Sequence, residues 1–305
     1  MRPPTRSSFA GAGASPRPSS IRPAARAAPG VRPRSASSGA GSEFLAHLLL
    51  APQHTDADGD HPVPSAVAAP RAYRIALDRL TTAGVPFCIG GAYAVAVYTG
   101  LNRTTRDLDL FLRPTDVERA LTVLDQAGFR VALVAEHWLG KARHGPYLID
   151  LVFGQGNGLQ PVDDRWLARA RPAVLWGRRV RVLAPEDLIW SKAYLASHDR
   201  FDGADIVHLI RATAGQLDWP YLLARFGAHR LLLLAHLTLV RFVYPSLDLV
   251  PPAVITDLIQ RCQAELSGPG PADRLCRGTL LDTASFWPDV TRWGYRDARS
   301  QPPGR

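Results

Sequence analysis

The sequence predicts an α/β (α+β) fold in which helices flank a mixed β-sheet, followed by a helical C-terminal region. From residue 69 onward, segments of helical periodicity alternate with short apolar segments, a pattern typical of a sheet covered by helices. From about residue 214 to about residue 280, apolar residues recur at helical spacing almost without interruption. With 305 residues and 46% hydrophobic content, the chain is long enough to enclose a substantial core.

The elements of the first part of the chain can be placed individually. Glycines end the first two expected helices, and turn residues separate the later segments. The expected elements are helices at residues 69–84, 91–100 and 115–128 and strands at residues 85–90, 108–113, 130–135, 147–153 and 179–183.

The positive charge of the chain is concentrated at its start. The formal net charge is +9, but residues 1–42 hold seven arginines and no acid, which leaves 29 basic against 27 acidic residues elsewhere. The remainder is close to neutral, which argues against a broad basic surface for nucleic acid. Residues 1–42 are also rich in Pro, Ser, Ala and Gly, a composition that predicts disorder.

Cysteine usage and hydropathy predict a cytoplasmic protein that does not enter a membrane. Cys88, Cys262 and Cys276 are far apart, odd in number and in no metal-ligand spacing. The longest apolar run, residues 231–240, is too short to cross a bilayer and is expected to form a buried helix.

Two aspartates lie on one face of a strand that should otherwise be buried. In "DLDLF", residues 107–111, the alternation of side chains puts Asp107 and Asp109 on one face and the leucines on the other. Two carboxylates about 7 Å apart repel each other, and a divalent cation would keep both ionised. The alternative is that they face solvent and are neutralised by Arg103 and Arg106.

A third acid and a pair of glycines extend this candidate site. Asp150 interrupts another apolar strand, "YLIDLVFG", so that three acids on neighbouring strands could bind hard metal ions. Gly90 and Gly91 stand between a strand and a helix, where a ligand can approach the backbone and the free N–H groups of the helix. A glycine pair is also typical of a simple tight turn.

The combination of motifs resembles the nucleotidyltransferases of the DNA polymerase β superfamily, particularly their small bacterial branch of abortive-infection toxin-like enzymes. The resemblance covers about residues 70–215 and rests on "IGGAYAV", "TTRDLDLFL", "LIDLVFG" and "APEDLIWSKAYLASHDRFDGADIVHLI". It implies a minimal nucleotidyltransferase core, with two Mg²⁺ ions as the expected cofactors and Mn²⁺ as a substitute.

The resemblance also implies roles for individual residues. Asp107, Asp109 and Asp150 would bind the metal ions and carry catalysis, the last by helping to activate the attacking hydroxyl. Gly90 and Gly91 would hold the triphosphate of the nucleotide. Arg106, beside the paired acids, is also assigned to the nucleotide.

Lysine usage offers a separate indication. Arginine supplies 34 of the 36 basic residues, and the only lysines are Lys141 and Lys192. A compact ammonium suits a point contact to a phosphate, so Lys192 is assigned to the nucleotide, the alternative being a surface lysine. Asp202 or Asp205 could cap the next helix, and Asp205, also assigned to the nucleotide site, could instead pair with Lys192. The glycines of "FGQGNG", residues 153–158, predict only a loop.

The predicted function is transfer of a nucleoside monophosphate from an NTP such as ATP to an acceptor hydroxyl, with release of pyrophosphate. The acceptor, whether tRNA, protein or small molecule, and the oligomeric state stay open. The alternatives are a nucleotide-sugar glycosyltransferase, because an Asp-x-Asp pair can also hold a metal, and a non-catalytic nucleotide-binding or partner-binding protein. The expected regions are a tail and linker at 1–68, a catalytic domain at 69–215, a helical region at 216–290 and a tail at 291–305.

Overall fold

The computed structural model describes residues 70–102, 105, 107–268 and 274–300. All of them belong to one unit of the chain, Asp58–Arg305. The arginine-rich segment 1–42 and the side chains of Arg103 and Arg106 lie outside the described residues, so the roles expected of them stay predictions.

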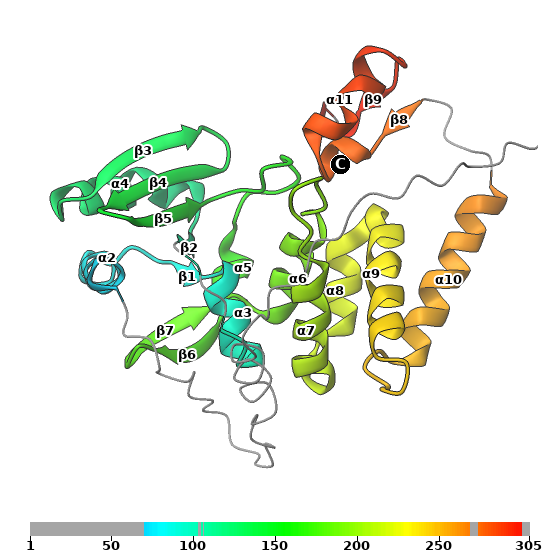
Figure 1. Cartoon of the computed structure of the whole chain (residues 1–305), viewed down its shortest axis with the longest axis horizontal. Coiled ribbons are helices and arrows are strands. Elements are labelled where there is room, and N and C mark those ends of the chain that lie inside the picture. Colours follow the sequence, from blue (N-terminus) through cyan, green and yellow to red (C-terminus); the bar gives the residue numbers. More distant parts are fainter. Residues whose placement is uncertain (1–69, 103–104, 106, 269–273, 301–305) are drawn as a thin grey trace, which may run out of the picture. The chain divides into compact units, whose positions relative to one another are not determined.

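A seven-stranded mixed sheet organises the first part of the described chain (Figure 1). Its order is β3-β4-β5-β2-β1-β7-β6, with parallel pairing between β2 and β5 and between β1 and β7. The strands are β1 (Cys88–Ile89), β2 (Asp107–Phe111), β3 (Arg130–Ala135), β4 (Leu139–His144), β5 (Tyr147–Val152), β6 (Arg171–Leu175) and β7 (Arg178–Val182). The predicted mixed sheet is therefore confirmed.

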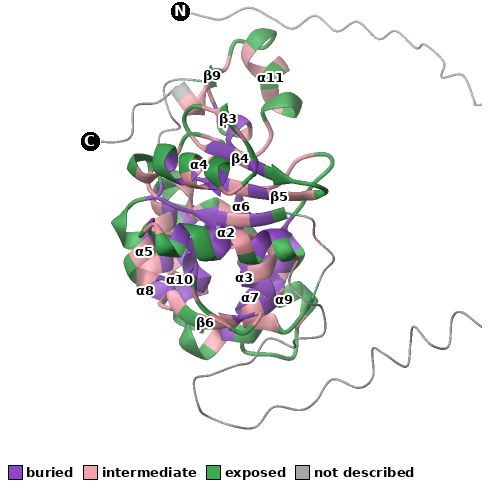
Figure 2. Ribbon diagram, turned by 90° about the vertical axis from the view of Figure 1, so that its left-hand side faces the viewer, coloured by how far each residue is buried: buried purple, intermediate pink, exposed green. Residues whose placement is uncertain are grey.

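Helices cover the sheet and then continue as a helical region. Figure 1 shows α6 to α10 in succession beside the sheet, and Figure 2 shows the buried positions gathered on the strands and on the helix faces that meet them. The helices are α2 (Arg71–Thr82), α3 (Gly91–Thr99), α4 (Val117–Gln126), α5 (Asp164–Arg169), α6 (Pro185–Ala193), α7 (Gly203–Thr213), α8 (Trp219–Phe226), α9 (Arg230–Val243), α10 (Pro252–Ser267) and α11 (Thr283–Thr291). The predicted α/β fold with a helical C-terminal region is confirmed.

Three elements of the sheet region, β4, β6 and α5, were not expected from the sequence. Strand β4 reads "LGKARH", in which a glycine and three basic residues obscure the alternation of polarity. Strand β6 contains Pro172, which is tolerated because β6 is an edge strand of the sheet. Helix α5 has only six residues, too few for a helical period to be recognised.

The helix expected to run almost unbroken from about residue 214 to about residue 280 is divided into the three helices α8, α9 and α10. Glycine and proline end or begin several of the segments: Gly227, with a φ of 46°, follows α8, and Pro252 begins α10. Beyond residue 274 the chain forms a small βαβ arrangement in which β8 (Leu275–Cys276) pairs in parallel with β9 (Arg296–Asp297) on either side of α11 in the chain.

One stretch, Trp219–Val243, is long and apolar enough to cross a membrane, judged by length and composition alone. Core helices of soluble proteins pass the same test. In the structure Gly227 separates α8 from α9, and Leu222, Leu233 and Leu237 on these helices are fully buried in the core. The expected buried helix at 231–240 is thus the central part of α9.

Candidate active site

Strand β2 separates its apolar and acidic side chains as the sequence predicts. Leu108 and Leu110 have no exposed surface, whereas Asp107 is exposed and Asp109 is half-buried. Asp107 and Asp109 line a cavity of about 680 Å³. This volume lies in the range of small-ligand sites.

Segments far apart in the sequence form this cavity. The turn before α3, strands β2 and β5, the loop after β5, helix α6, the connection from α6 to α7, and the segment before α11 all contribute. The lining residues are Gly91, Ala92, Thr105, Asp107, Asp109, Phe111, Trp138, Asp150, Val152, Gly154, Gln155, Gly156, Asn157, Ser191, Lys192, Tyr194, Leu195, Arg200, Asp202, Thr279, Leu280, Leu281 and Thr283.

Asp109 and Asp150 face the cavity side by side. They are paired in register on the parallel strands β2 and β5, so their side chains point to the same face of the sheet. Burial, followed by the charge of Asp150, raises the pKa of Asp109 to about 6. Burial also raises the pKa of Asp150, against the opposing effect of Lys141. It is therefore unfavourable for both carboxylates to be ionised at the same time unless a cation binds between them.

The glycine turn packs directly against Asp109. The N–H of Gly90 donates to the carbonyl oxygen of Asp109 at 2.9 Å. Gly91 has a φ of 56°, and a Cβ atom there would lie 1.7 Å from an Asp109 carboxylate oxygen. A Cβ atom at Gly90 would lie 2.2 Å from the Phe111 ring. Both positions require glycine, and the turn brings the first N–H groups of α3 to the same cavity as the carboxylates.

Lys192 is buried, so the surface alternative considered for it is wrong. Its side chain, in the last turn of α6, is 6% exposed. Its ammonium lies 2.7 Å from a carboxylate oxygen of Asp202 and 2.8 Å from one of Asp205. Asp202 stands at the N-cap position of α7 but makes no capping hydrogen bond with its side chain. The acids at the start of α7 therefore hold Lys192 at the cavity.

Arg200 is a cavity residue that the sequence analysis missed. In the connection between α6 and α7, its guanidinium donates two hydrogen bonds to Asp202, at 3.0 and 3.1 Å. Burial is the largest single effect and raises the pKa of Asp202, but Arg200 and Lys192 together outweigh it and lower that pKa. Among 34 arginines nothing in the sequence distinguishes this one, and only the fold brings it beside Lys192.

Lys141 was noted in the sequence but given no role. It lies on β4 opposite Asp150, and its ammonium is 3.0 and 3.2 Å from the two carboxylate oxygens of Asp150. Both lysines of the chain therefore pair with aspartates that line the cavity. If β4 had been recognised as a strand, the alternation of side chains along β4 and β5 would have indicated that Lys141 and Asp150 can lie on the same face of the sheet.

The fit of the carboxylates to a metal ion can be judged from their partners. Within the described ranges, no group of three or more His, Cys, Asp or Glu side chains is already gathered as a metal site. Asp150 is engaged by Lys141, whereas no described cation is hydrogen-bonded to the carboxylate of Asp107 or Asp109. These two offer the hard oxygen ligands that Mg²⁺ prefers, and burial, followed by the charge of Asp150, raises the pKa of Asp109 against the opposing effect of Lys192 and Arg200. The pair fits a divalent cation, with Asp150 available once it leaves Lys141.

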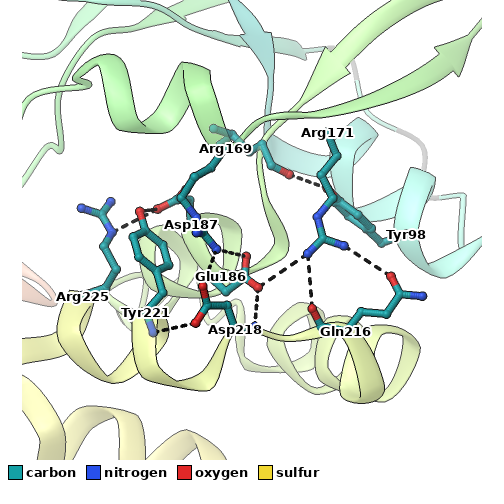
Figure 3. A network of polar contacts seen from close by, with 10 residues as sticks. Tyr98, Arg169, Arg171, Glu186, Asp187, Gln216, Asp218, Tyr221 and Arg225 are labelled. Atoms are coloured by element: carbon teal, nitrogen blue, oxygen red, sulfur yellow. Dashed lines mark hydrogen bonds and ion pairs between the residues drawn. The ribbon is translucent and has the colours of Figure 1, made fainter.

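A buried polar network fixes the beginning of α6, the helix that carries Lys192 (Figure 3). Glu186 and Asp187 have no exposed surface. Glu186 accepts a hydrogen bond from the backbone N–H of Asp218 at 2.8 Å, and Asp187 accepts one from the Tyr221 hydroxyl at 2.9 Å. Arg225, 3.0 Å from Asp187, lies over the rings of Trp166 and Trp190. The network connects α6 to α8 and so limits where Lys192 can lie.

Comparison with known proteins gives the class of this protein. Residues 76–242, more than half of the chain, match the sequence profile of a family described as uncharacterised nucleotidyltransferases. The chain belongs to this family. No curated protein matches it.

Several solved structures are similar to this chain. The antibiotic-resistance factor ANT(2″)-Ia has 20% identity and a TM-score of 0.41, over 54% of this chain and 94% of that one. The lincosamide antibiotic adenylyltransferase LnuA, with lincomycin bound, has 16% identity and a TM-score of 0.37, over 47% and 96%. JHP933 from Helicobacter pylori has 14% identity and a TM-score of 0.34, over 72% and 94%.

Proposed function

We propose that the protein is a metal-dependent nucleotidyltransferase that moves a nucleoside monophosphate from an NTP to an acceptor hydroxyl. The observation that carries this proposal is the packing of the Gly90–Gly91 turn on Asp109. It puts a helix N-terminus, which favours phosphate, beside carboxylates, which favour a divalent cation. A nucleoside triphosphate with its metal presents both charges together.

In the proposed reaction the acceptor oxygen bonds to the α-phosphorus of the nucleotide, and the bond from that phosphorus to the departing pyrophosphate breaks. The proton of the acceptor hydroxyl passes to a base. Asp150 is the candidate base because it lies in the cavity and burial raises its pKa, and a base with a raised pKa holds a proton more readily.

Asp107 and Asp109 would hold the metal, Mg²⁺ or Mn²⁺, with Asp150 as a further ligand. When bound, the metal would neutralise the charge that develops on the phosphate oxygens. Lys192 and Arg200, which also line the cavity, would supply the remaining positive charge. Two of the three N–H groups of Lys192 meet Asp202 and Asp205, which leaves one for a phosphate oxygen.

The proposal keeps the finer predictions made from the sequence. ATP is the expected nucleotide, the cytoplasm the expected location, and kinship with the abortive-infection toxin-like branch the expected relationship. The buried Lys192 and the glycine turn on Asp109 support a nucleotide site over a nucleotide-sugar site, because both address phosphate and neither addresses a sugar.

The test is to incubate the protein with Mg²⁺ and each NTP, labelled with ³²P at either the α or the γ position, together with a cell extract. We expect label from the α position in an acceptor and label from the γ position in pyrophosphate. The Asp109→Asn variant should show neither. Transfer of the γ label to an acceptor would identify a kinase, and retention of nucleotide without turnover would identify a binding protein.

A further inference from the structure

The cavity has a second wall that the proposed chemistry does not use. It consists of Trp138, residues 154–157 and the lining residues of 279–283, and is called the neutral wall below. None of the described residues that form it carries a charged side chain. The charged lining residues belong instead to β2, β5, α6 and the connection to α7. The charged and the uncharged lining residues thus come from different segments of the chain.

The loop of the neutral wall is held in place by its backbone. The N–H of Phe153 donates to the carbonyl oxygen of Trp138 at 2.9 Å. The N–H of Gln155 donates to the carbonyl oxygen of Gln160 at 3.0 Å. A Cβ atom at Gly154 would lie 2.5 Å from the carbonyl oxygen of His137, so glycine is required for this approach. The loop expected from "FGQGNG" is therefore a formed part of the cavity.

The other half of the neutral wall comes from the segment before α11. The side-chain amide of Asn157 donates to the carbonyl oxygen of Leu280 at 3.2 Å and so joins this segment to the loop. The hydroxyl of Thr279 is 2.7 Å from a carboxylate oxygen of Asp297, on β9. This segment lies beyond residues 76–242, where the family match ends. The shape of this wall therefore comes partly from residues outside the matched region.

The chemistry of the wall defines what it can bind. Trp138 and Leu281 offer apolar surface, and an indole favours a flat or ring-shaped ligand. The carboxamide of Gln155 has no hydrogen-bond partner among the described residues, so it can both donate to and accept from a ligand. A nucleic acid would bring phosphates, which need cations that this wall lacks. A charged ligand would lose its water without gaining an oppositely charged partner from this wall.

We infer that the neutral wall is the acceptor subsite and that the acceptor is a small, uncharged molecule with hydroxyl groups and an apolar ring face. The inference rests on the proposed function, since an acceptor is needed only if a nucleotidyl group is transferred.

The experiment uses the full chain, Mg²⁺ and NTPs labelled with ³²P at the α position. A cell extract is divided into RNA, protein and molecules below about 1 kDa, a limit chosen from the usual size of pocket ligands. We expect label in the small-molecule fraction alone. After release from the nucleotide by a phosphodiesterase, the acceptor should pass unretained through both cation- and anion-exchange resins at pH 7.

Variants then locate the subsite. Gln155→Leu removes the free carboxamide, and Leu281→Glu adds a charge to the wall. Each should lower labelling at limiting acceptor about tenfold or more, the usual effect of an unpaired polar or charged group in a site. The stabilisation by Mg²⁺ and NTP should be unchanged. Trp293→Glu is the control, because Trp293 follows α11, is 61% exposed and does not line the cavity.

The outcomes separate the two proposals. Labelled RNA or protein, or a charged released acceptor, overturns the inference and leaves the proposed function standing. Equal labelling by Leu281→Glu, Gln155→Leu and Trp293→Glu also overturns it. Absence of both label and pyrophosphate in every fraction overturns the proposed function and the inference with it.

Discussion

At the scale of single residues, Asp109 is the group whose charge state most affects the site. It is half-buried, stands beside Asp150 and touches Gly91, and its pKa is raised to about 6. An acid whose pKa is higher in the folded state than in the unfolded state binds a proton on folding. The folded protein therefore gains stability as the pH falls through 6 towards the ordinary value of an aspartate.

Asp109→Asn should remove this pH dependence. The variant should melt at a higher temperature than the parent at pH 8, because it no longer carries a negative charge beside Asp150. The gain in free energy of unfolding should be only on the order of 1–2 kcal/mol, because the side chain is partly open to the cavity and solvent screens the repulsion. The difference should shrink as the pH approaches 4.5. Melting temperatures of both proteins across this range, without metal or nucleotide, give the comparison. A difference that grows towards low pH would contradict the assignment.

Lys192 should not tolerate replacement by arginine. A guanidinium is larger than an ammonium, and its planar fork cannot take the place of a point donor between Asp202 and Asp205. We expect kcat/KM of Lys192→Arg to fall at least about tenfold with the fold kept. Lys192→Met should lower the free energy of unfolding by about 3–5 kcal/mol, because it leaves buried carboxylates without a cation. Parental kinetics in Lys192→Arg would limit Lys192 to a structural role.

The role of a single residue could be predicted from the sequence only where it depends on neighbours close by in the sequence. The acidic face of β2 follows from the alternation of side chains, a local property of a strand. The pairs Lys141–Asp150 and Arg200–Asp202 depend on which strands and loops become neighbours. Lysine's rarity singled out Lys192, but no comparable signal marked Arg200.

At the scale of elements, the turn between β1 and α3 links the proposed phosphate-binding part of the site to its acidic part. Gly91 and Gly100, at the two ends of α3, both have positive φ angles, of 56° and 69°. A Cβ atom at Gly91 would clash with Asp109, whereas no atom lies within 4 Å of a Cβ atom placed at Gly100. The two glycines therefore form a matched pair in which backbone conformation is similar and packing differs.

Gly91→Ala should abolish the stabilisation that Mg²⁺ and NTP give the protein, because the new methyl group displaces the Asp109 carboxylate. Gly100→Ala should cost about 1 kcal/mol of stability for its left-handed conformation and keep the ligand effect. Thermal shift with and without ligand measures both. Equal ligand stabilisation in the two variants would show that the turn does not position Asp109.

The elements themselves were predictable where their patterns were regular. The helices α2, α3 and α4 and the strands β3, β5 and β7 lie where periodicity placed them. Strand β4 and the breaks between α8, α9 and α10 were missed, because basic residues in β4 and long apolar stretches in the helices hide the local boundaries.

At the scale of the whole molecule, contacts cross the boundary expected between the catalytic domain and the helical region. That boundary, at residues 215 and 216, stays a prediction. Asp218 and Arg225 lie after it, and they contact Glu186 and Asp187 before it. Arg225 also lies over the rings of Trp166 and Trp190. Burial of this kind couples the stability of the two regions.

We therefore expect the two regions to unfold in a single cooperative transition. Arg225→Met should lower the midpoint by an amount corresponding to about 3 kcal/mol or more, because Asp187 loses its cation while fully buried. Urea unfolding followed by circular dichroism and by tryptophan fluorescence measures this. Two separate transitions in the parent would show that the network does not couple the regions.

The central claim is that Asp107 and Asp109 hold the metal of a nucleoside triphosphate, and one measurement tests it most directly. Pyrophosphate release and the melting temperature would be recorded for the parent, Asp107→Asn and Asp109→Asn, with and without Mg²⁺ and NTP. Each variant should release no pyrophosphate, fold at least as stably as the parent without ligand, and lose the stabilisation by Mg²⁺ and NTP. Variants that melt markedly lower without ligand, yet are still protected by nucleotide, would show that these carboxylates serve the fold and not the reaction.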